Sequence, residues 1–236
     1  MGEIYYITPN DLINPNTLFQ LIYPSETLNY YFSDDFSESF YIQLAQAGFI
    51  SVSYTEDDIQ YLLPEMQFEY AVLDFANLHI SKKVHKLLKN PELYSFSINK
   101  HPYKVLEKLN SYHKESWIEK EYLELLKRLI DFKDTTVDFQ LISCELICNE
   151  TGILVSGEIG YKIGSTYTSL SGFTTKEKKY NNYGKLQLTL LSQYLEKNNY
   201  SFWNMGHPYM QYKLDLGAIV LKRKDFLKRW LKEVDQ

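Results

Sequence analysis

Three consecutive runs of strand-forming residues constrain the fold of this 236-residue chain more than any other feature. They read "FQLISCELICNE" (139–150), "GILVSGEIGYKIG" (152–164) and "STYTSLSGFT" (165–174). Each run is rich in β-branched and aromatic residues, and the "NETG" that joins the first two is typical of a hairpin. The runs therefore predict three neighbouring antiparallel strands at the centre of a sheet.

The segments around these runs predict a layered α/β fold. The pattern predicts helices at 81–90, 101–113, 116–132, 183–198 and 222–234, strands at 94–99, 200–204 and 216–221, and a short turn or helix at 207–213. This order is similar to that of GNAT acyltransferases, whose central strands splay apart to form the site. Acetyl-coenzyme A users of that fold carry a Q/R-x-x-G-x-G/A loop that wraps pyrophosphate. The corresponding stretch here, residues 172–188, lacks that motif.

The first part of the chain reads as short alternating elements. Strands are predicted at 4–8, 28–33, 49–54 and 70–75, and helices at 14–23 (capped by Asn14 or Asn16) and 37–48 (from Ser37 to Gly48). The sequence therefore predicts a smaller N-terminal α/β module, residues 1–76, followed by a GNAT-like catalytic domain, residues 77–236.

Charge is divided unevenly along the chain. Residues 1–81 contain 12 acidic residues and no Lys or Arg, whereas residues 82–236 contain 25 basic and 18 acidic residues, a balance of +7. A basic part of this kind suits a polyanion. The acidic part either meets a cationic partner, such as a basic protein N-terminus, or holds the basic part. Drift in surface composition is the third interpretation.

Several function classes find no support in the sequence. No run approaches the roughly 20 apolar residues of a membrane helix, and the N-terminus has no signal-peptide pattern. The chain has no HExxH or CxxC motif, so no metal site is predicted. Cys144 and Cys148 are expected to be reduced core residues. We therefore expect a cytoplasmic protein that binds neither a membrane nor a metal.

The C-terminal two-thirds resembles the leucyl/phenylalanyl-tRNA–protein transferase family. "LHIS" (78–81) and "SWI" (116–118) are similar to the family's LHIS-R and TWI segments. Residues 154–173 align without a gap on the pattern LVGGxYGxxxGxxFxGESMF, and "DLGAIVLKRKDFL" (215–227) is similar to SLGAxEIPRxxFL. More weakly, "AGFISV" (47–52) is similar to RGIFPW. The resemblance implies transfer of an amino acid from aminoacyl-tRNA, with no other cofactor, to a protein N-terminus, which marks that protein for degradation.

The sequence departs from the family at its functional carboxylates. Leu170 stands where the family's GES motif has glutamate, and Asn204 stands opposite the aspartate of its IDCQ motif. Among nearby residues, His207 is the best replacement for a base, because the ordinary pKa of histidine suits proton transfer near neutrality. Asn204 is predicted to hydrogen-bond the α-amine or the carbonyl of the substrate. The alternatives are that His207 caps a turn and that Asn204 satisfies the backbone at a strand end.

The resemblance also places residues around the aminoacyl group. Glu158 occupies a position where the family has an apolar pocket residue, and a carboxylate there favours a cationic or hydrogen-bonding side chain. The alternative is that Glu158 points to solvent. Trp117 matches a family tryptophan that flanks the pocket; the alternative is a plain core tryptophan, which would look the same in the sequence. The predicted pocket residues are Trp117, Glu158, Leu170, Gly172 and Trp203.

Three basic clusters, interleaved with tyrosine and tryptophan, predict contacts with tRNA phosphates. The predicted tRNA-binding residues are Lys82, Lys83, Lys86, Lys179, Lys185, Lys222, Arg223 and Arg229. Solvated faces of amphipathic helices explain each cluster alone. Two other functions therefore stay open: an acyltransferase that uses a thioester, and a non-catalytic protein that binds tRNA or a degron.

Overall fold

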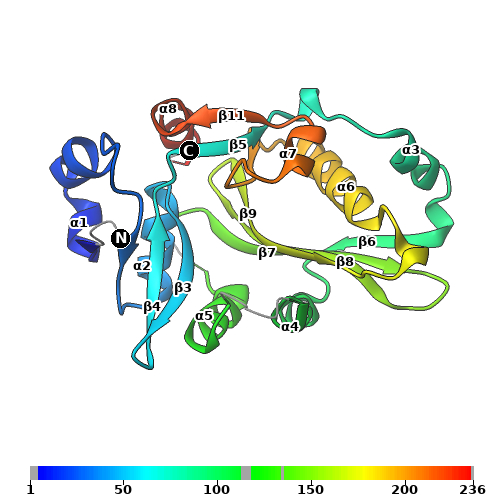
Figure 1. Ribbon diagram of the computed structural model, residues 1–236, viewed down its shortest axis with the longest axis horizontal. Helices are drawn as coiled ribbons and strands as arrows, with labels where there is room; N and C mark the ends of the chain where they lie inside the picture. The colour runs from blue at the N-terminus through cyan, green and yellow to red at the C-terminus, as the bar shows by residue number, and fades with distance from the viewer. Residues whose placement is uncertain (1–4, 113–117, 134–135, 235–236) are drawn as a thin grey trace.

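A mixed sheet forms the body of the protein in a computed structural model, which describes residues 5–112, 118–133 and 136–234 (Figure 1). Across these residues seven strands follow the order β11-β5-β10-β9-β8-β7-β6. The bounds are β5 Glu69–Leu73, β6 Tyr94–Ile98, β7 Phe139–Cys148, β8 Leu154–Ile163, β9 Thr166–Thr174, β10 Phe202–Asn204 and β11 Ile219–Lys222. The three long strand runs of the sequence are β7, β8 and β9, which pair antiparallel as predicted.

The sheet parts where its one parallel pair ends. Within the described residues β9 and β10 form that pair, from Phe202 opposite Thr166 to Asn204 opposite Thr168. Strand β9 continues to Thr174, whereas β10 stops at Asn204, so the two strands separate beyond this point. This divergence confirms the predicted α/β fold of the GNAT kind, because a splayed parallel pair is the feature that leaves room for a site in the sheet.

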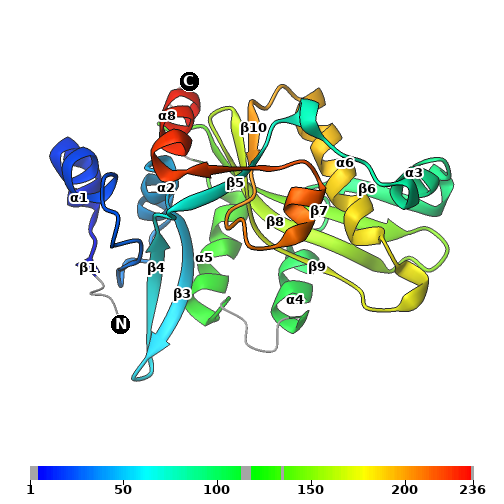
Figure 2. The same ribbon diagram turned by 45° about the horizontal axis from the view of Figure 1, so that its top comes forward.

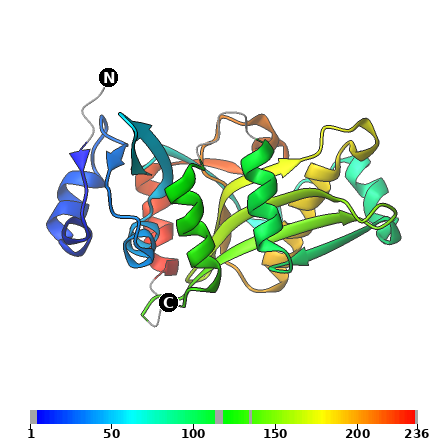
Figure 3. The ribbon, with the colours of Figure 1, turned by 90° about the horizontal axis from the view of Figure 1, so that it is seen from below.

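Helices cover both faces of the sheet. Helices α4 (Pro102–Tyr112) and α5 (Lys120–Asp131) lie on one face, and Figure 3 shows both from that side. Helices α6 (Tyr183–Lys197) and α7 (Gln211–Asp215) lie on the other face, α3 (Lys82–Leu88) lies at the β6 end, and α8 (Arg223–Val234) lies beside β11. The apolar side of α5 recurs every three or four residues at Tyr122, Leu125 and Leu129, which are fully buried.

The N-terminal part is more regular than the sequence predicted. Its elements are β1 (Tyr5–Tyr6), α1 (Pro9–Ile13), the π-helix η1 (Thr17–Ile22), β2 (Tyr31–Phe32), α2 (Glu38–Gln46), β3 (Ile50–Glu56) and β4 (Ile59–Glu65). Ser37 caps α2 as predicted, accepting a hydrogen bond from the Phe40 amide. Helix α1 and strand β4 were not predicted, and the helix predicted at 14–23 is a π-helix at 17–22.

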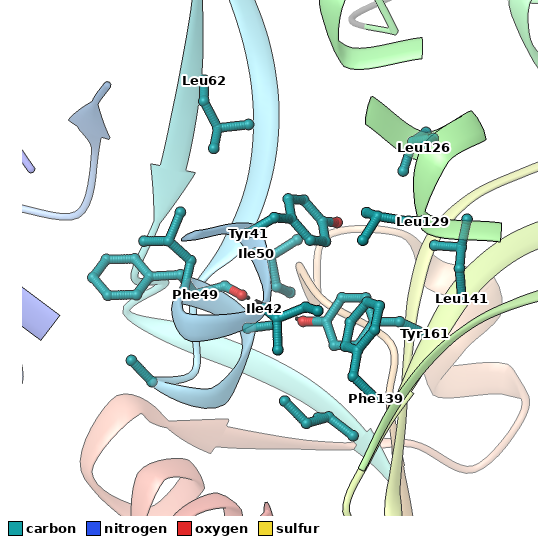
Figure 4. Close-up of a cluster of buried hydrophobic side chains, with 14 of the residues drawn as sticks. Tyr41, Ile42, Phe49, Ile50, Leu62, Leu126, Leu129, Phe139, Leu141 and Tyr161 are labelled. Carbon is teal, nitrogen blue, oxygen red and sulfur yellow. Dashed lines mark hydrogen bonds between the residues drawn. The ribbon is translucent and has the colours of Figure 1, made fainter. Parts of the chain in front are cut away.

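The N-terminal part and the large sheet share one core. Tyr41 on α2 contacts Tyr122 on α5, with 3.1 Å between their hydroxyl oxygens, and the Tyr122 hydroxyl donates to the Ser51 carbonyl. Figure 4 shows Tyr41 and Ile42 packed toward Phe139 and Tyr161 of the sheet. Strand β5, which precedes the predicted boundary at residue 76, also lies in the large sheet (Figure 2). The two-domain division itself stays a prediction.

Two further findings bear on the function classes. No helix within the described ranges is long and apolar enough to cross a membrane. The two cysteines of the chain are both free and buried, as predicted.

Candidate active site

A cavity of about 430 Å³ lies where β9 and β10 part. Strands β8 and β9 form one wall, the first turns of α6 form a second, and the segment from Met205 to Lys213 closes the third. Of the residues predicted for the aminoacyl pocket, Glu158, Leu170 and Gly172 line this cavity. Its volume lies within the range of small-ligand pockets.

Glu158 is the carboxylate of the cavity wall. It is 4% exposed, which excludes the alternative that it points to solvent. Its Oε1 accepts hydrogen bonds from the Tyr167 hydroxyl (3.0 Å) and the Ser169 hydroxyl (2.6 Å). Among the described residues no cationic side chain lies within 4.0 Å of Glu158. Burial raises the pKa of Glu158 to about 7, although the two hydroxyl donors oppose this.

Local irregularities in the strands create this environment. Glu158 pairs directly with Gly172, which has no side chain to fill the space beside the carboxylate. Leu170 is the extra residue of a β-bulge, because Ile159 pairs with Ser171 and Gly160 with Ser169. A Cβ at Gly160 would lie 2.3 Å from the Tyr167 hydroxyl oxygen. Glycine at 160 is therefore required for that hydroxyl to reach Glu158.

Trp203 supports the cavity wall from behind. It is fully buried, and its Nε1 donates to the Ser169 Oγ over 2.7 Å. Because Ser169 donates onward to Glu158, the indole, the hydroxyl and the carboxylate form one chain of hydrogen bonds. Trp203 does not line the cavity itself. Its hydrogen bond positions Ser169, which does.

Lys213 is the buried cation of the same cavity, and sequence reasoning did not select it. It lies on α7, is 6% exposed and lines the cavity together with Glu158. Its Nζ donates to two main-chain carbonyls, those of Met205 and His207. Burial lowers the pKa of Lys213 to about 8, and the carboxylate of Glu158 partly offsets this. Its only signal in the sequence was its place at the end of the short turn or helix predicted at 207–213.

Asn204 and His207, the residues predicted for catalysis, do not line the cavity. The Asn204 amide donates to the Thr168 Oγ1 (3.3 Å) and accepts from the Gly206 amide (3.0 Å), as expected of a residue that satisfies a strand end. The His207 Nε2 lies 2.8 Å from the Oε2 of Glu65. Glu65 is buried on β4, and sequence reasoning missed it because that strand was not predicted.

A second cavity of about 240 Å³ adjoins the first. Lys185, Leu188 and Tyr212 line both. The LHIS and LGA motifs meet at this second cavity, where the His79 amide donates to the Leu216 carbonyl. Gly217 makes this approach possible, since its φ is +107° and a Cβ would lie 2.0 Å from the Asn77 carbonyl oxygen.

Comparison with known proteins identifies the family. The family model described as leucyl/phenylalanyl-tRNA protein transferase matches residues 72–231, more than half of the chain. The chain belongs to this family. No curated protein matches it in sequence.

Solved structures are similar at low identity. FemX is 10% identical with a TM-score of 0.48, and the match covers 84% of this chain and 71% of FemX. L-PGS from Bacillus licheniformis is 11% identical with a TM-score of 0.43, covering 83% of this chain and 69% of L-PGS. A tandem GNAT protein from the clavulanic acid biosynthesis pathway is 8% identical with a TM-score of 0.41, covering 84% of this chain and 65% of that protein.

The basic residues of this family member fall into two spatial groups. Lys82, Lys83 and Lys86 (the α3 lysines) are exposed on α3, which packs against α6, the helix that carries Lys185. Lys185 lies 3.4 Å from Asp215 at the rim of the second cavity. The α3 lysines and Lys185 therefore lie on the side of the protein that contains the two cavities.

The remaining predicted tRNA-binding residues, like Lys185, interact with other residues of the protein. Arg223 is 5% exposed, and its guanidinium donates to the main-chain carbonyls of Ile22, Ser25, Leu28, Met66 and Gln67. This arrangement leaves Arg223 no free N–H donor for a phosphate, so the structure gives the predicted tRNA contact at this residue no support. Lys179, Lys222 and Arg229 pair with Glu177, Glu69 and Asp74 respectively.

Trp117 lies outside the described residues, and so does the "SW" of the SWI segment. Within the described ranges no group of three or more His, Cys, Asp or Glu side chains is arranged to hold a metal ion.

Proposed function

We propose that this protein transfers an amino acid from charged tRNA to the N-terminal amine of an acceptor protein. The carrying observation is a cavity at the strand splay, with one buried carboxylate, in a member of the leucyl/phenylalanyl-tRNA protein transferase family. The reaction is aminolysis of an ester: the amine forms a bond to the carbonyl carbon and the tRNA 3′ oxygen leaves. Holding the two reactants together supplies most of the acceleration that this chemistry needs.

Glu158 sets the preference for the transferred side chain. An ionised carboxylate without a cationic neighbour within 4.0 Å is stabilised by a cationic ligand, and its protonated form donates a hydrogen bond to a polar one. Leu and Phe side chains offer neither partner. The proposed aminoacyl group is therefore basic or hydrogen-bonding, which sets this chain apart from the amino acids in its family's name.

The tRNA approaches over α3 and α6. The α3 lysines are exposed, and Lys185, on the helix that α3 packs against, lines the main cavity. Phosphate contacts of this kind are independent of sequence and weaken as salt rises. Since charged tRNA is a cytoplasmic substrate, the proposed reaction belongs in the cytoplasm, where a residue added to a protein N-terminus would act as a degradation signal.

Mass spectrometry tests the proposal directly. The purified protein is mixed with total aminoacylated tRNA and a set of peptides that covers every N-terminal residue. Gain of one residue's mass on a peptide is expected, and the mass names the amino acid. No gain, with salt-sensitive tRNA binding retained, would replace the transferase with a non-catalytic tRNA-binding protein.

The Glu158 assignment has its own test. Wild type, Glu158→Met and the exposed control Glu150→Gln are compared on Leu-charged and Arg-charged tRNA. The Met variant should lose preference for the cationic residue by one to two orders of magnitude, as expected when a buried charge pair is removed, while the control keeps it. An unchanged preference in Glu158→Met would remove Glu158 from the specificity pocket.

A further inference from the structure

Lys213 is a buried cation whose place in the cavity calls for a role. The ammonium group of lysine has three hydrogen-bond donors. Two of them are directed at the Met205 and His207 carbonyls, which fixes the position of Nζ. Among the described residues no third acceptor and no carboxylate pairs with Nζ. The third N–H of the ammonium group is therefore left for a ligand in the cavity, which Lys213 lines together with Glu158 and Gly172.

The location of Lys213 suits the reacting ester. The segment that its ammonium group holds, Met205–His207, follows β10 directly, at the point where β9 and β10 part. Leu170 and Asn204 stand where the family has carboxylates, so this chain has no carboxylate at either position. Of the two lysines that line the cavity, Lys213 is buried and Lys185 is half-exposed beside Asp215. A cation fixed by two main-chain carbonyls is pre-organised, and pre-organised donors stabilise developing charge better than mobile ones.

We propose that Lys213 contacts the aminoacyl carbonyl oxygen and stabilises the negative charge that develops on it when the acceptor amine attacks. This inference rests on the proposed aminoacyl transfer. The amine nitrogen forms a bond to the carbonyl carbon, and the carbonyl electron pair moves to the oxygen that Lys213 faces. Collapse of this intermediate breaks the bond to the tRNA 3′ oxygen, which takes the proton that the amine loses. Lys213 acts as an ammonium ion and is unchanged at the end.

Because Lys213 acts as an ammonium ion, the transfer rate should depend on pH in a particular way. The titratable groups that face the cavity around Lys213 are Glu158 on β8, Tyr112 at the end of α4, Lys185 on α6 and Tyr212 on α7. Burial holds the pKa of Lys213 at about 8 and raises that of Tyr212 to about 12. The rate should rise as the acceptor α-amine deprotonates, near pH ~8 for a free amine, and fall as Lys213 loses its proton.

The test compares wild type with Lys213→Met, Lys213→Arg and the exposed control Lys108→Met on α4. The substrates are the aminoacyl-tRNA and peptide identified by mass spectrometry, and single-turnover rates are measured from pH 6.5 to 9.5. Lys213→Met should lose about 10²- to 10³-fold in rate with tRNA affinity unchanged, the loss typical of an oxyanion donor. Wild type should show a descending limb near pH 8 that is absent in Lys213→Arg, because arginine stays charged.

Each other outcome overturns the inference in a recognisable way. A Lys213→Met rate within about threefold of wild type, or a wild-type rate that rises without a fall to pH 9.5, removes Lys213 from the reaction and leaves the transferase function standing. If Lys213→Met fails to fold, the wild-type and Lys213→Arg profiles decide. A wild type that transfers no amino acid from any tRNA overturns the function and this inference together.

Discussion

Glu158→Gln should make the stability of the protein less dependent on pH. The pKa of Glu158 is about 7 in the fold against an ordinary value of 4.5, mainly because of burial. Below pH 4.5 the carboxyl is protonated in the folded and unfolded chains alike. Between pH 4.5 and 7 the unfolded chain releases the proton while the fold keeps it, so the free energy of unfolding falls as pH rises and levels off above about 7. The difference of about 2.5 in pKa corresponds to about 3 kcal/mol.

Urea unfolding of both proteins from pH 4.5 to 9 measures this effect. The glutamine side chain keeps an oxygen that accepts from Tyr167 and Ser169 and adds no charge. The difference in unfolding free energy between Glu158→Gln and wild type should therefore move by about 3 kcal/mol in favour of the variant between pH 4.5 and 8. The exposed control Glu150→Gln should show no such trend.

The result that would refute this reasoning is a flat difference. If the two stability curves stayed parallel within about 0.5 kcal/mol from pH 4.5 to 9, Glu158 would be ionised in the fold across that range. The carboxylate would then have a partner that compensates its burial, and the cavity would have less need of a cationic ligand. The same experiment therefore bears on the proposed specificity.

Three further outcomes are expected. Arg223→Leu should lower the free energy of unfolding by about 3–5 kcal/mol in urea melts, because five main-chain carbonyls lose their donor; a loss no larger than that of exposed Lys224→Leu would contradict this. Replacing the α3 lysines by Gln should reduce the slope of log affinity for tRNA against log salt by about 2, measured by fluorescence anisotropy; an unchanged slope would place the tRNA elsewhere. Gly217→Ala should cost at least about 2 kcal/mol in thermal or urea unfolding, since φ is +107° and the Asn77 carbonyl blocks a Cβ; a neutral effect would mean that the two motifs separate easily.

The sequence predicted the sheet centre well because its signal is local. Hairpin chemistry at "NETG" and long β-branched runs specify β7, β8 and β9 without reference to the rest of the chain. Strand β4 was missed because Pro64 interrupts its run, and a proline argues against a strand that pairs on both sides. That strand pairs mainly with β3, at the margin of the fold, where proline is tolerated.

The site was only partly predictable, since it depends on contacts between distant segments. Alternation along β9 cannot show which side chains face the cavity, because the bulge at Leu170 shifts the alternation and leaves no clear sequence signal. Lys213 becomes a site residue only when the segment after β10 folds back onto α7. In the same way, the segment "LKRKDF" presents Arg223 as one of several exposed cations. Only the fold shows that five main-chain carbonyls from the N-terminal part surround it.

Contacts within the protein match part of the uneven charge along the chain. Acidic residues of the first 81 positions pair with basic residues of the remainder, in the pairs Glu38–Arg128, Glu69–Lys222 and Asp74–Arg229. Such surface pairs contribute only about 0–1 kcal/mol each to stability. The shared hydrophobic core therefore holds the N-terminal part and the large sheet together. The interpretation that the acidic part meets the basic part is therefore supported only for these three pairs.

The same contacts locate the surface left for a polyanion. At the β11 and α8 end, Arg223 and Arg229 bind N-terminal carbonyls or carboxylates, while Lys222, paired with Glu69, and Lys224 stay exposed away from the main cavity's lining. At the α3 end the lysines are exposed, and the helix packs on α6 beside both cavities. A tRNA whose 3′ end enters the main cavity would therefore lay its phosphates along α3, because that is where exposed positive charge and the proposed reaction site lie next to each other.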